Sequence, residues 1–307
     1  MGNAIETTAE SAEGQLRATA IGAVAVLLWS TLALLTTLSG KAPPFQLVSM
    51  AFSVAFLIGV LLWWKQGVSP LRDIRLPWRV WMLGIGGLFG YHFLYFLALR
   101  NAPAVEANLI NYLWPLLIVL LSSFLPGERL RWYHLLGALA GLAGALMLIS
   151  DGQGVGINKE YAFGYLVAIG SALTWAIYSV LSRRFGQVPT HAVGAFCGIT
   201  AVLSALCHLW FEVTVWPQSF EWVAIFLLGL GPVGGAFFVW DHGVKHGNIK
   251  ILGAFAYMAP LVSTLLLVMT GRAEPSWILL YACLLIVGGA LIAAGDLIKI
   301  KSWPGSD

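Results

Sequence analysis

Polar and aromatic side chains that could hold a small solute recur along one face of the apolar stretch at 103–125. The spacing i, i+3, i+4 and i+7 joins Asn108, Asn111, Tyr112 and Pro115, and it places them on one face of a helix. Two amides and a phenol are costly to expose to lipid, so this face points to a cavity or to another helix. The pattern therefore predicts either the wall of a binding site or hydrogen bonds between helices without ligand contact.

A second group of this kind lies at 78–99, where Tyr91, His92 and Tyr95 share a helical face. His92 is the one histidine near the middle of an apolar stretch, since the other five lie within a turn or two of an end. A lone buried histidine is either a satisfied structural residue or a functional group, which would donate to a substrate carboxylate or gate a polar cavity. The two neighbouring tyrosines favour the cavity.

Aromatic residues from the rest of the chain complete the expected site. Trp114 follows Tyr112, and Trp29 and Trp175 fall near mid-helix, away from the interfacial belts in which tryptophan is enriched. Rings would stack on an apolar solute while amides hold its polar head. The candidate substrate-binding residues are Tyr91, His92, Tyr95, Asn108, Asn111, Tyr112, Trp114, Trp175, Trp240 and Tyr257.

Much of this pattern occurs twice at an offset of 145 residues. Tyr112-Leu113-Trp114-Pro115 returns as Tyr257-Met258-Ala259-Pro260, and Arg100 and Gly144 correspond to Lys245 and Gly289. Pro115 and Pro260 are expected to bend their helices, because proline leaves a carbonyl without its helical partner. The copies are unequal, since Asn108, Asn111 and His92 correspond to Gly253, Ala256 and Phe237.

The composition of the chain indicates that these residues lie on membrane-spanning helices. The chain is 59% hydrophobic and 10% charged, with a mean hydropathy of +0.83, whereas soluble domains carry about 25% charge. A helix needs roughly 20 apolar residues to cross a bilayer. We expect ten spans, at 17–39, 43–64, 78–99, 103–125, 131–150, 161–184, 190–211, 219–243, 248–270 and 276–298.

Five spans in each copy force the second copy to enter the membrane upside down, which is an arrangement from which alternating-access transporters are built. The predicted fold is therefore an all-α integral membrane protein of ten transmembrane helices in two inverted five-helix repeats. The predicted domains are a polar cytoplasmic tail at 1–16, a first repeat at 17–150, a loop at 151–160, a second repeat at 161–298 and a cytoplasmic tail at 299–307.

Lysine and arginine predict the orientation. With the N-terminus in the cytoplasm, 13 of these residues lie on the cytoplasmic side and four, namely Lys41, Arg100, Lys159 and Arg272, on the other. The positive-inside rule then places both termini in the cytoplasm. The acidic N-terminus lacks the basic region of a cleavable signal peptide, so the first span is expected to stay.

Other chemistries are weakly supported. Gly152-Gln153-Gly154-Val155-Gly156 lacks the strand and lysine of a nucleotide loop, and His242 and His246 lack the glutamate of a zinc-protease helix. Cys197, Cys207 and Cys283 have no metal or redox spacing. We expect no metal, no cofactor, no nucleic acid and no enzymatic activity. Asp241, near the inner end of its span, is a candidate for gating or coupling.

Several short blocks resemble a known family. Gly127-Glu128-Arg129-Leu130 and the five-plus-five layout resemble the EamA-type branch of the drug/metabolite transporter superfamily, over nearly the whole chain. The blocks closest to the bacterial aromatic amino acid exporters of that superfamily are Leu28-Trp29-Ser30, Asn111 to Pro115, Trp175-Ala176-Ile177-Tyr178, His246-Gly247-Asn248, Ile251-Leu252 and Tyr257-x-x-Pro260. Asp241 departs from that pattern, because some relatives would carry an uncharged asparagine there.

The resemblance implies a bacterial inner-membrane exporter of aromatic, and other neutral, amino acids through a central cavity that Tyr112, Trp114 and Trp175 line or support. An exporter of drugs, other metabolites or other amino acids stays open as an alternative, as do a passive channel and, less favoured, a membrane enzyme. Gly137, Gly141 and Gly144 form a small-residue face that favours packing within one molecule, so a monomer is expected and a dimer is left open.

Overall fold

The computed structural model describes residues 2–69, 75–151, 158–271 and 274–294. Within these residues the regular structure is entirely helical, and nine helices are long and apolar enough to cross a membrane. A tenth apolar helix, Trp277–Ala293, is shorter. The Gly152–Gly156 loop, Arg72, Arg272 and the predicted tail at 299–307 lie outside the described residues.

The first repeat consists of five spans, three of which are divided. The elements in order are α1 (Gly2–Ser30) with α2 (Leu32–Leu38), α3 (Pro44–Gln66), α5 (Trp78–Ile85) with η1 (Gly86–Gly90) and α6 (Tyr91–Asn101), α7 (Ala104–Asn111) with α8 (Trp114–Ser122), and α9 (Trp132–Ile149).

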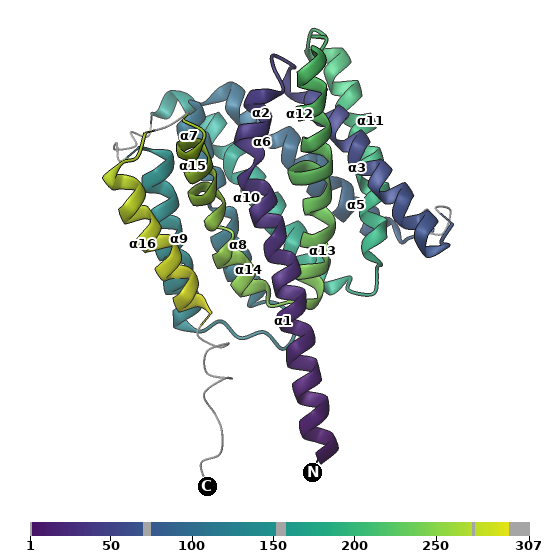
Figure 1. Cartoon of the computed structure of the whole chain (residues 1–307), viewed down its shortest axis with the longest axis vertical. Helices are drawn as coiled ribbons and strands as arrows, with labels where there is room; N and C mark the ends of the chain where they lie inside the picture. Colours follow the sequence, from purple (N-terminus) through teal and green to yellow (C-terminus); the bar gives the residue numbers. More distant parts are fainter. Residues whose placement is uncertain (1, 70–74, 152–157, 272–273, 295–307) are drawn as a thin grey trace.

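The second repeat has the same order of spans. Its elements are η2 (Lys159–Tyr161) with α10 (Ala162–Arg184), η3 (Thr190–Ala192) with α11 (Val193–Phe211), α12 (Ser219–Leu230) with η4 (Gly231–Gly235) and α13 (Ala236–His246), α14 (Ile249–Phe255) with α15 (Met258–Met269), and α16 (Trp277–Ala293). In Figure 1, α1 begins and α16 ends at the same end of the bundle, called the inner end below.

The third and eighth spans contain π-helical segments at equivalent positions. Gly86–Gly90 and Gly231–Gly235 are separated by the same 145 residues as the sequence repeat. Close packing explains a glycine here, because a Cβ on Gly87 would lie 2.3 Å from the ring of Tyr178. π-helical turns inside helices occur frequently at functional sites.

The fourth and ninth spans are also interrupted at matching places, Tyr112-Leu113 and Ala256-Tyr257. Pro115 and Pro260 lie in the first turns of the helices that follow, α8 and α15. The first break frees the N–H of Leu116, which donates to the Tyr257 hydroxyl at 3.1 Å. The broken spans of the two repeats are therefore tied to each other.

The first and last helices differ in extent from the spans expected from hydropathy. α1 already begins at Gly2, so the segment predicted as a polar tail continues the first helix. Its alanines and glutamates are strong helix formers, and no proline interrupts them. At the other end α16 stops at Ala293, and the predicted end of that span at 298 lies outside the described residues.

The glycine-rich helices α9 and α16 lie side by side at one edge of the bundle (Figure 1). A Cβ on Gly137 would come within 2.4 Å of the Gly289 carbonyl oxygen, and one on Gly144 within 2.7 Å of Ile286. Gly141 packs in the same way on the ring of Tyr257. The small-residue face predicted from sequence is thus used inside one molecule.

Candidate functional site

Five aromatic side chains meet where the two repeats join, and they form what we call the aromatic cluster: Trp29, Trp114, Trp175, Phe237 and Trp240. The first two belong to α1 and α8 of the first repeat, and the others to α10 and α13 of the second. Trp29 lies at its centre, with ring centroids 5.0 Å from Trp240 and 5.9 Å from Trp114. The predicted residues Trp114, Trp175 and Trp240 are therefore brought together.

The cluster joins residues that correspond to each other in the two repeats. Trp29 and Trp175 are in contact, with centroids 5.7 Å apart and planes at 78°. This edge-to-face geometry is favourable for aromatic pairs. Trp240 is fully buried and its indole N–H donates to the Ser179 hydroxyl at 3.0 Å. The rings thus form a packed apolar wall in which the buried N–H of Trp240 has a hydrogen-bond partner.

A polar group lies directly beside the cluster and holds the two amides predicted from sequence. The Asn111 amide N–H donates to the Tyr91 hydroxyl at 3.1 Å, and its carbonyl oxygen accepts from Ser171 at 2.7 Å. Tyr95 donates to the Asn108 carbonyl oxygen. The ring of Tyr91 joins this polar group to the cluster, with its centroid 5.4 Å from that of Trp175. In this conformation both amides bond between helices, so a ligand must compete with these contacts.

His92 belongs to the same region but points its Nδ1 to its own helix. That nitrogen lies 2.7 Å from the carbonyl oxygen of Leu88. Because a carbonyl only accepts, Nδ1 carries the proton, and in the neutral ring Nε2 is the acceptor. The imidazole packs against Phe52, Phe96 and Phe237.

Tyr112 and Tyr257 lie apart from the aromatic cluster. Tyr257 is completely buried, its hydroxyl bonded to Leu116 and its ring against Gly141. Tyr112 is partly buried and packs on the same apolar group, which includes Val119 and Leu142. These two tyrosines therefore stand where the broken spans meet α9.

Asp241 lies at the inner end of α13 and is almost fully buried. Its Oδ2 is 2.7 Å from the Lys245 ammonium and accepts a hydrogen bond of 2.9 Å from Thr190. Lys245 also donates to the Val188 carbonyl at 2.9 Å. The ion pair lies within α13, and the hydrogen bond from Thr190 links it to the start of the seventh span.

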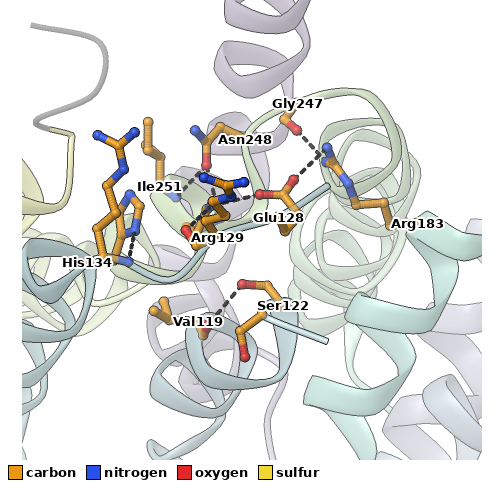
Figure 2. A network of polar contacts seen from close by, with 12 residues as sticks. Val119, Ser122, Glu128, Arg129, His134, Arg183, Gly247, Asn248 and Ile251 are labelled. Carbon is orange, nitrogen blue, oxygen red and sulfur yellow. Dashed lines mark hydrogen bonds and ion pairs between the residues drawn. The ribbon is translucent and has the colours of Figure 1, made fainter. Parts of the chain in front are cut away.

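A second set of ion pairs at the inner end, which we call the inner network, connects the two repeats. Glu128 lies 3.0 Å from the Arg183 guanidinium and 2.7 Å from the Lys250 ammonium. Arg183 also donates to the Gly247 carbonyl at 2.5 Å, and Figure 2 shows it between Glu128 and Gly247. The loop after α8 is therefore bound to the ends of α10 and α13 and to the start of α14.

The list of candidate substrate-binding residues omitted four residues of this region: Trp29, Phe52, Ser171 and Phe237. Trp29 carried a usable signal, because it pairs with Trp175 across the repeat at mid-helix depth. Phe237 was identifiable as the counterpart of His92. Phe52, which stacks on Phe237 with centroids 5.5 Å apart, and Ser171 had no distinguishing pattern.

Comparison with known proteins agrees with this architecture. The model of the EamA-like transporter family matches residues 17–150 and again 162–295. A protein of Ancylobacter novellus named aromatic amino acid exporter YddG is 55% identical over 277 residues, which are 90% of this chain and 96% of the relative. A protein of the same name from Escherichia coli is 27% identical over 293 residues, covering 90% of this chain and 96% of its own.

A solved crystal structure has the same fold. It superposes with a TM-score of 0.87 at 54% identity, and the match covers 91% of this chain and 98% of that one.

Proposed function

The chain belongs to the EamA-like transporter family, and we propose that it exports neutral, mainly aromatic amino acids across the bacterial inner membrane by alternating access. The names of its relatives support an amino acid exporter, because the two described above are both named aromatic amino acid exporter. A Streptantibioticus cattleyicolor relative, 24% identical over 237 residues (76% of this chain and 75% of the relative), is named a probable terminal-alkyne amino-acid exporter. The last name favours a wider range of amino acids as the second candidate function.

The observation that carries the proposal is the aromatic cluster at the junction of the repeats. Its rings come from both halves, and an aromatic side chain of the substrate is proposed to replace some of their mutual contacts. Stacking is worth about 0.5–1.5 kcal/mol for each ring pair beyond the buried area. Because these rings now touch one another, substrate entry requires the repeats to move apart, as rocking of one repeat against the other would do.

The polar group supplies what a zwitterion needs. An asparagine amide offers both a donor and an acceptor, so Asn108 and Asn111 can serve a carboxylate and an ammonium. The Nε2 of neutral His92 adds an acceptor. The proposed head-group site uses no acidic side chain, which suits a neutral amino acid better than a cationic drug.

The membrane arrangement is proposed from charge. Excess lysine and arginine at the inner end place that end, and with it both termini, in the cytoplasm. The glycine face is occupied by contacts within the chain, which supports a monomer. We infer that the protein acts as a transporter without catalysing a reaction.

Counterflow in proteoliposomes tests the function. Vesicles loaded with unlabelled phenylalanine should accumulate labelled phenylalanine, and a panel of aromatic and other neutral amino acids should compete better than cationic drugs. Repeating the assay with and without a pH gradient identifies proton coupling. Flux that rises linearly with concentration would instead indicate a channel.

Tyr112→Ala tests whether the site extends from the aromatic cluster to the break between α7 and α8. If the ring supports the substrate, phenylalanine and tryptophan transport below saturation should fall about 10-fold, as expected for a lost aromatic contact. Tyr281→Ala, at a 56% exposed tyrosine, is the matched control. Unchanged transport in a fully folded Tyr112→Ala variant would exclude Tyr112 from the site.

A further inference from the structure

A pocket at the outer end of the bundle has a composition suited to the proposed substrate. Its volume is ≈ 80 Å³, and it is lined by Phe45, Phe93, Phe96, Leu97, Arg100 and Phe211. These residues come from the start of α3, from the length of α6 and from the end of α11. Four phenyl rings and one guanidinium match a ligand with an aromatic ring and an anionic group.

We propose that this pocket is a second binding site, which holds an exported aromatic amino acid by its ring and its carboxylate before release at the outer end. The inference rests on the proposed function and adds to it a site separate from the aromatic cluster.

Arg100 keeps free hydrogen-bond donors beside its ion pair with Glu212. Its guanidinium lies 3.6 Å from Glu212, which is too long for a hydrogen bond, and its side chain is 48% exposed. Glu212 is already occupied, because its carboxylate accepts from the backbone N–H groups of Phe45 and Gln46 at 3.0 and 3.1 Å. His208 contacts the same carboxylate at 3.0 Å. Arg100 therefore keeps donors for another carboxylate, which guanidinium groups bind through two parallel hydrogen bonds.

A row of rings connects this pocket with the aromatic cluster. Phe237 of the cluster lies 6.2 Å from His92, measured between ring centroids, and His92 lies 6.2 Å from Phe96. Phe96 then contacts Phe45 edge-on at 5.5 Å. An aromatic side chain that leaves the cluster would thus meet further rings on its way to the outer end.

The repeat supports an exit role. Phe96 and Arg100 correspond to Asp241 and Lys245 at the inner end. There a second pocket of only ≈ 10 Å³ is lined by Val188, Asp241 and Lys245 among others, and the last two form the 2.7 Å ion pair. Equivalent places in the two repeats therefore differ, with more space at the outer end than at the inner end. The two copies of an inverted repeat must differ in conformation if one end is to admit a solute while the other does not.

The test measures half-saturation separately on the two faces of oriented proteoliposomes, using phenylalanine counterflow. Arg100→Gln removes the charge, and Arg100→Lys retains it. Lys159→Gln removes another exposed cation expected on the same side and serves as the matched control. Phenethylamine, which has the ring but no carboxylate, is the comparison inhibitor.

We expect Arg100→Gln to raise the outer-face half-saturation about 10-fold, as for a lost hydrogen bond to a charged group, and to leave the inner-face value unchanged. It should also abolish the preference for phenylalanine over phenethylamine at the outer face. Arg100→Lys should retain most of that preference, and Lys159→Gln should match the wild type. Normal inner-face transport in each variant confirms that it has folded.

Three results would overturn the inference. The first is an unchanged outer-face value in Arg100→Gln, and the second is an equal loss on both faces. The third is outer-face inhibition that follows the acyl-chain length of added lipid instead of competing with phenylalanine, because the pocket would then bind lipid. If the wild type moves no aromatic amino acid at all, the proposed function itself fails and this inference falls with it.

Discussion

At the scale of single residues, the side chains with the most distinctive chemistry share their contacts with one another. Trp175 illustrates this, because its ring touches Trp29, Trp114 and Trp240 within the cluster and Tyr91 outside it. It is 3% exposed. A residue in this position determines both the packing at the repeat junction and the surface that a substrate ring would meet.

We expect Trp175→Ala to lower the free energy of unfolding by about 3–5 kcal/mol, because it leaves a cavity among packed rings. Thermal unfolding in detergent micelles measures this loss, and phenylalanine counterflow should fall below detection. Trp210→Ala removes the same side chain from an 83% exposed position and should change stability by less than about 0.5 kcal/mol. Equal stability losses in the two variants would contradict a central role for Trp175.

At the scale of helices, the two repeats share interruptions of regular α-helix in corresponding spans. The third and eighth spans share a π-helical segment, and the fourth and ninth share a break. Interrupted spans in corresponding positions of two repeats commonly mark a transport site. The uninterrupted pair α9 and α16 instead packs backbone against backbone through glycine. Interrupted spans thus contribute to the candidate site, and a regular pair lies at the edge.

Two adjacent glycines of α16 provide a controlled test of that pair. A Cβ on Gly289 would lie 2.6 Å from the Gly137 carbonyl oxygen, whereas one on Gly288 would meet nothing within 4 Å. Gly289→Ala should therefore cost about 1–3 kcal/mol of stability, as overpacked sites do, while Gly288→Ala should be neutral. Thermal unfolding and size-exclusion chromatography measure stability and oligomeric state. If Gly289→Ala instead dissociated a dimer at unchanged monomer stability, the glycine face would be an interface between molecules.

At the scale of the whole molecule, ion pairs tie the two repeats together at the inner end of the bundle. The inner network joins Glu128 of the first repeat to Arg183 and Lys250 of the second. Lys250 also donates to the Arg129 carbonyl at 3.0 Å. Rocking of the repeats toward an inward-facing state would have to separate these charges, so the network stabilises the state with a closed inner end.

We expect Glu128→Gln to favour opening of the inner end, because two largely buried cations lose their carboxylate. The closed inner end should lose about 2 kcal/mol of stabilisation. This is less than for a fully buried ion pair, because Glu128 and Arg183 are partly exposed. A Ser182→Cys reporter, placed at a buried residue beside the small inner pocket, should then react at least ~10-fold faster with an impermeant maleimide applied to the inner face. The three native cysteines are replaced by alanine in this background.

Glu160→Gln, at an exposed carboxylate of the outer end, is the control and should leave the labelling rate unchanged. A Glu128→Gln rate equal to that of the control would mean that the inner network does not hold the inner end closed.

The residues of the candidate site were predictable to different degrees. Asn108, Asn111, Tyr91 and Tyr95 could be assigned to shared polar faces from helical spacing, and these faces do meet. Their partner Ser171 could not be identified, because serine is common in apolar helices and its role depends on which helix lies opposite. Tyr257 was expected beside Tyr112 from the repeat, but its bond to Leu116 follows from how one broken span docks on the other.

The sequence alone determined that the chain is helical, how many spans it has and how it repeats. Span length depends only on the run of apolar residues needed to cross a bilayer, and the repeat is a comparison of residues at a fixed offset. Only the tertiary structure decided which rings meet, which acid pairs with which base, and where polar contacts tie the two repeats together. Lipid-facing helices can pack in many arrangements of similar energy, since no hydrophobic force between helices selects one. One arrangement is selected by close packing at glycines such as Gly289 and by individual ion pairs such as that between Glu128 and Lys250.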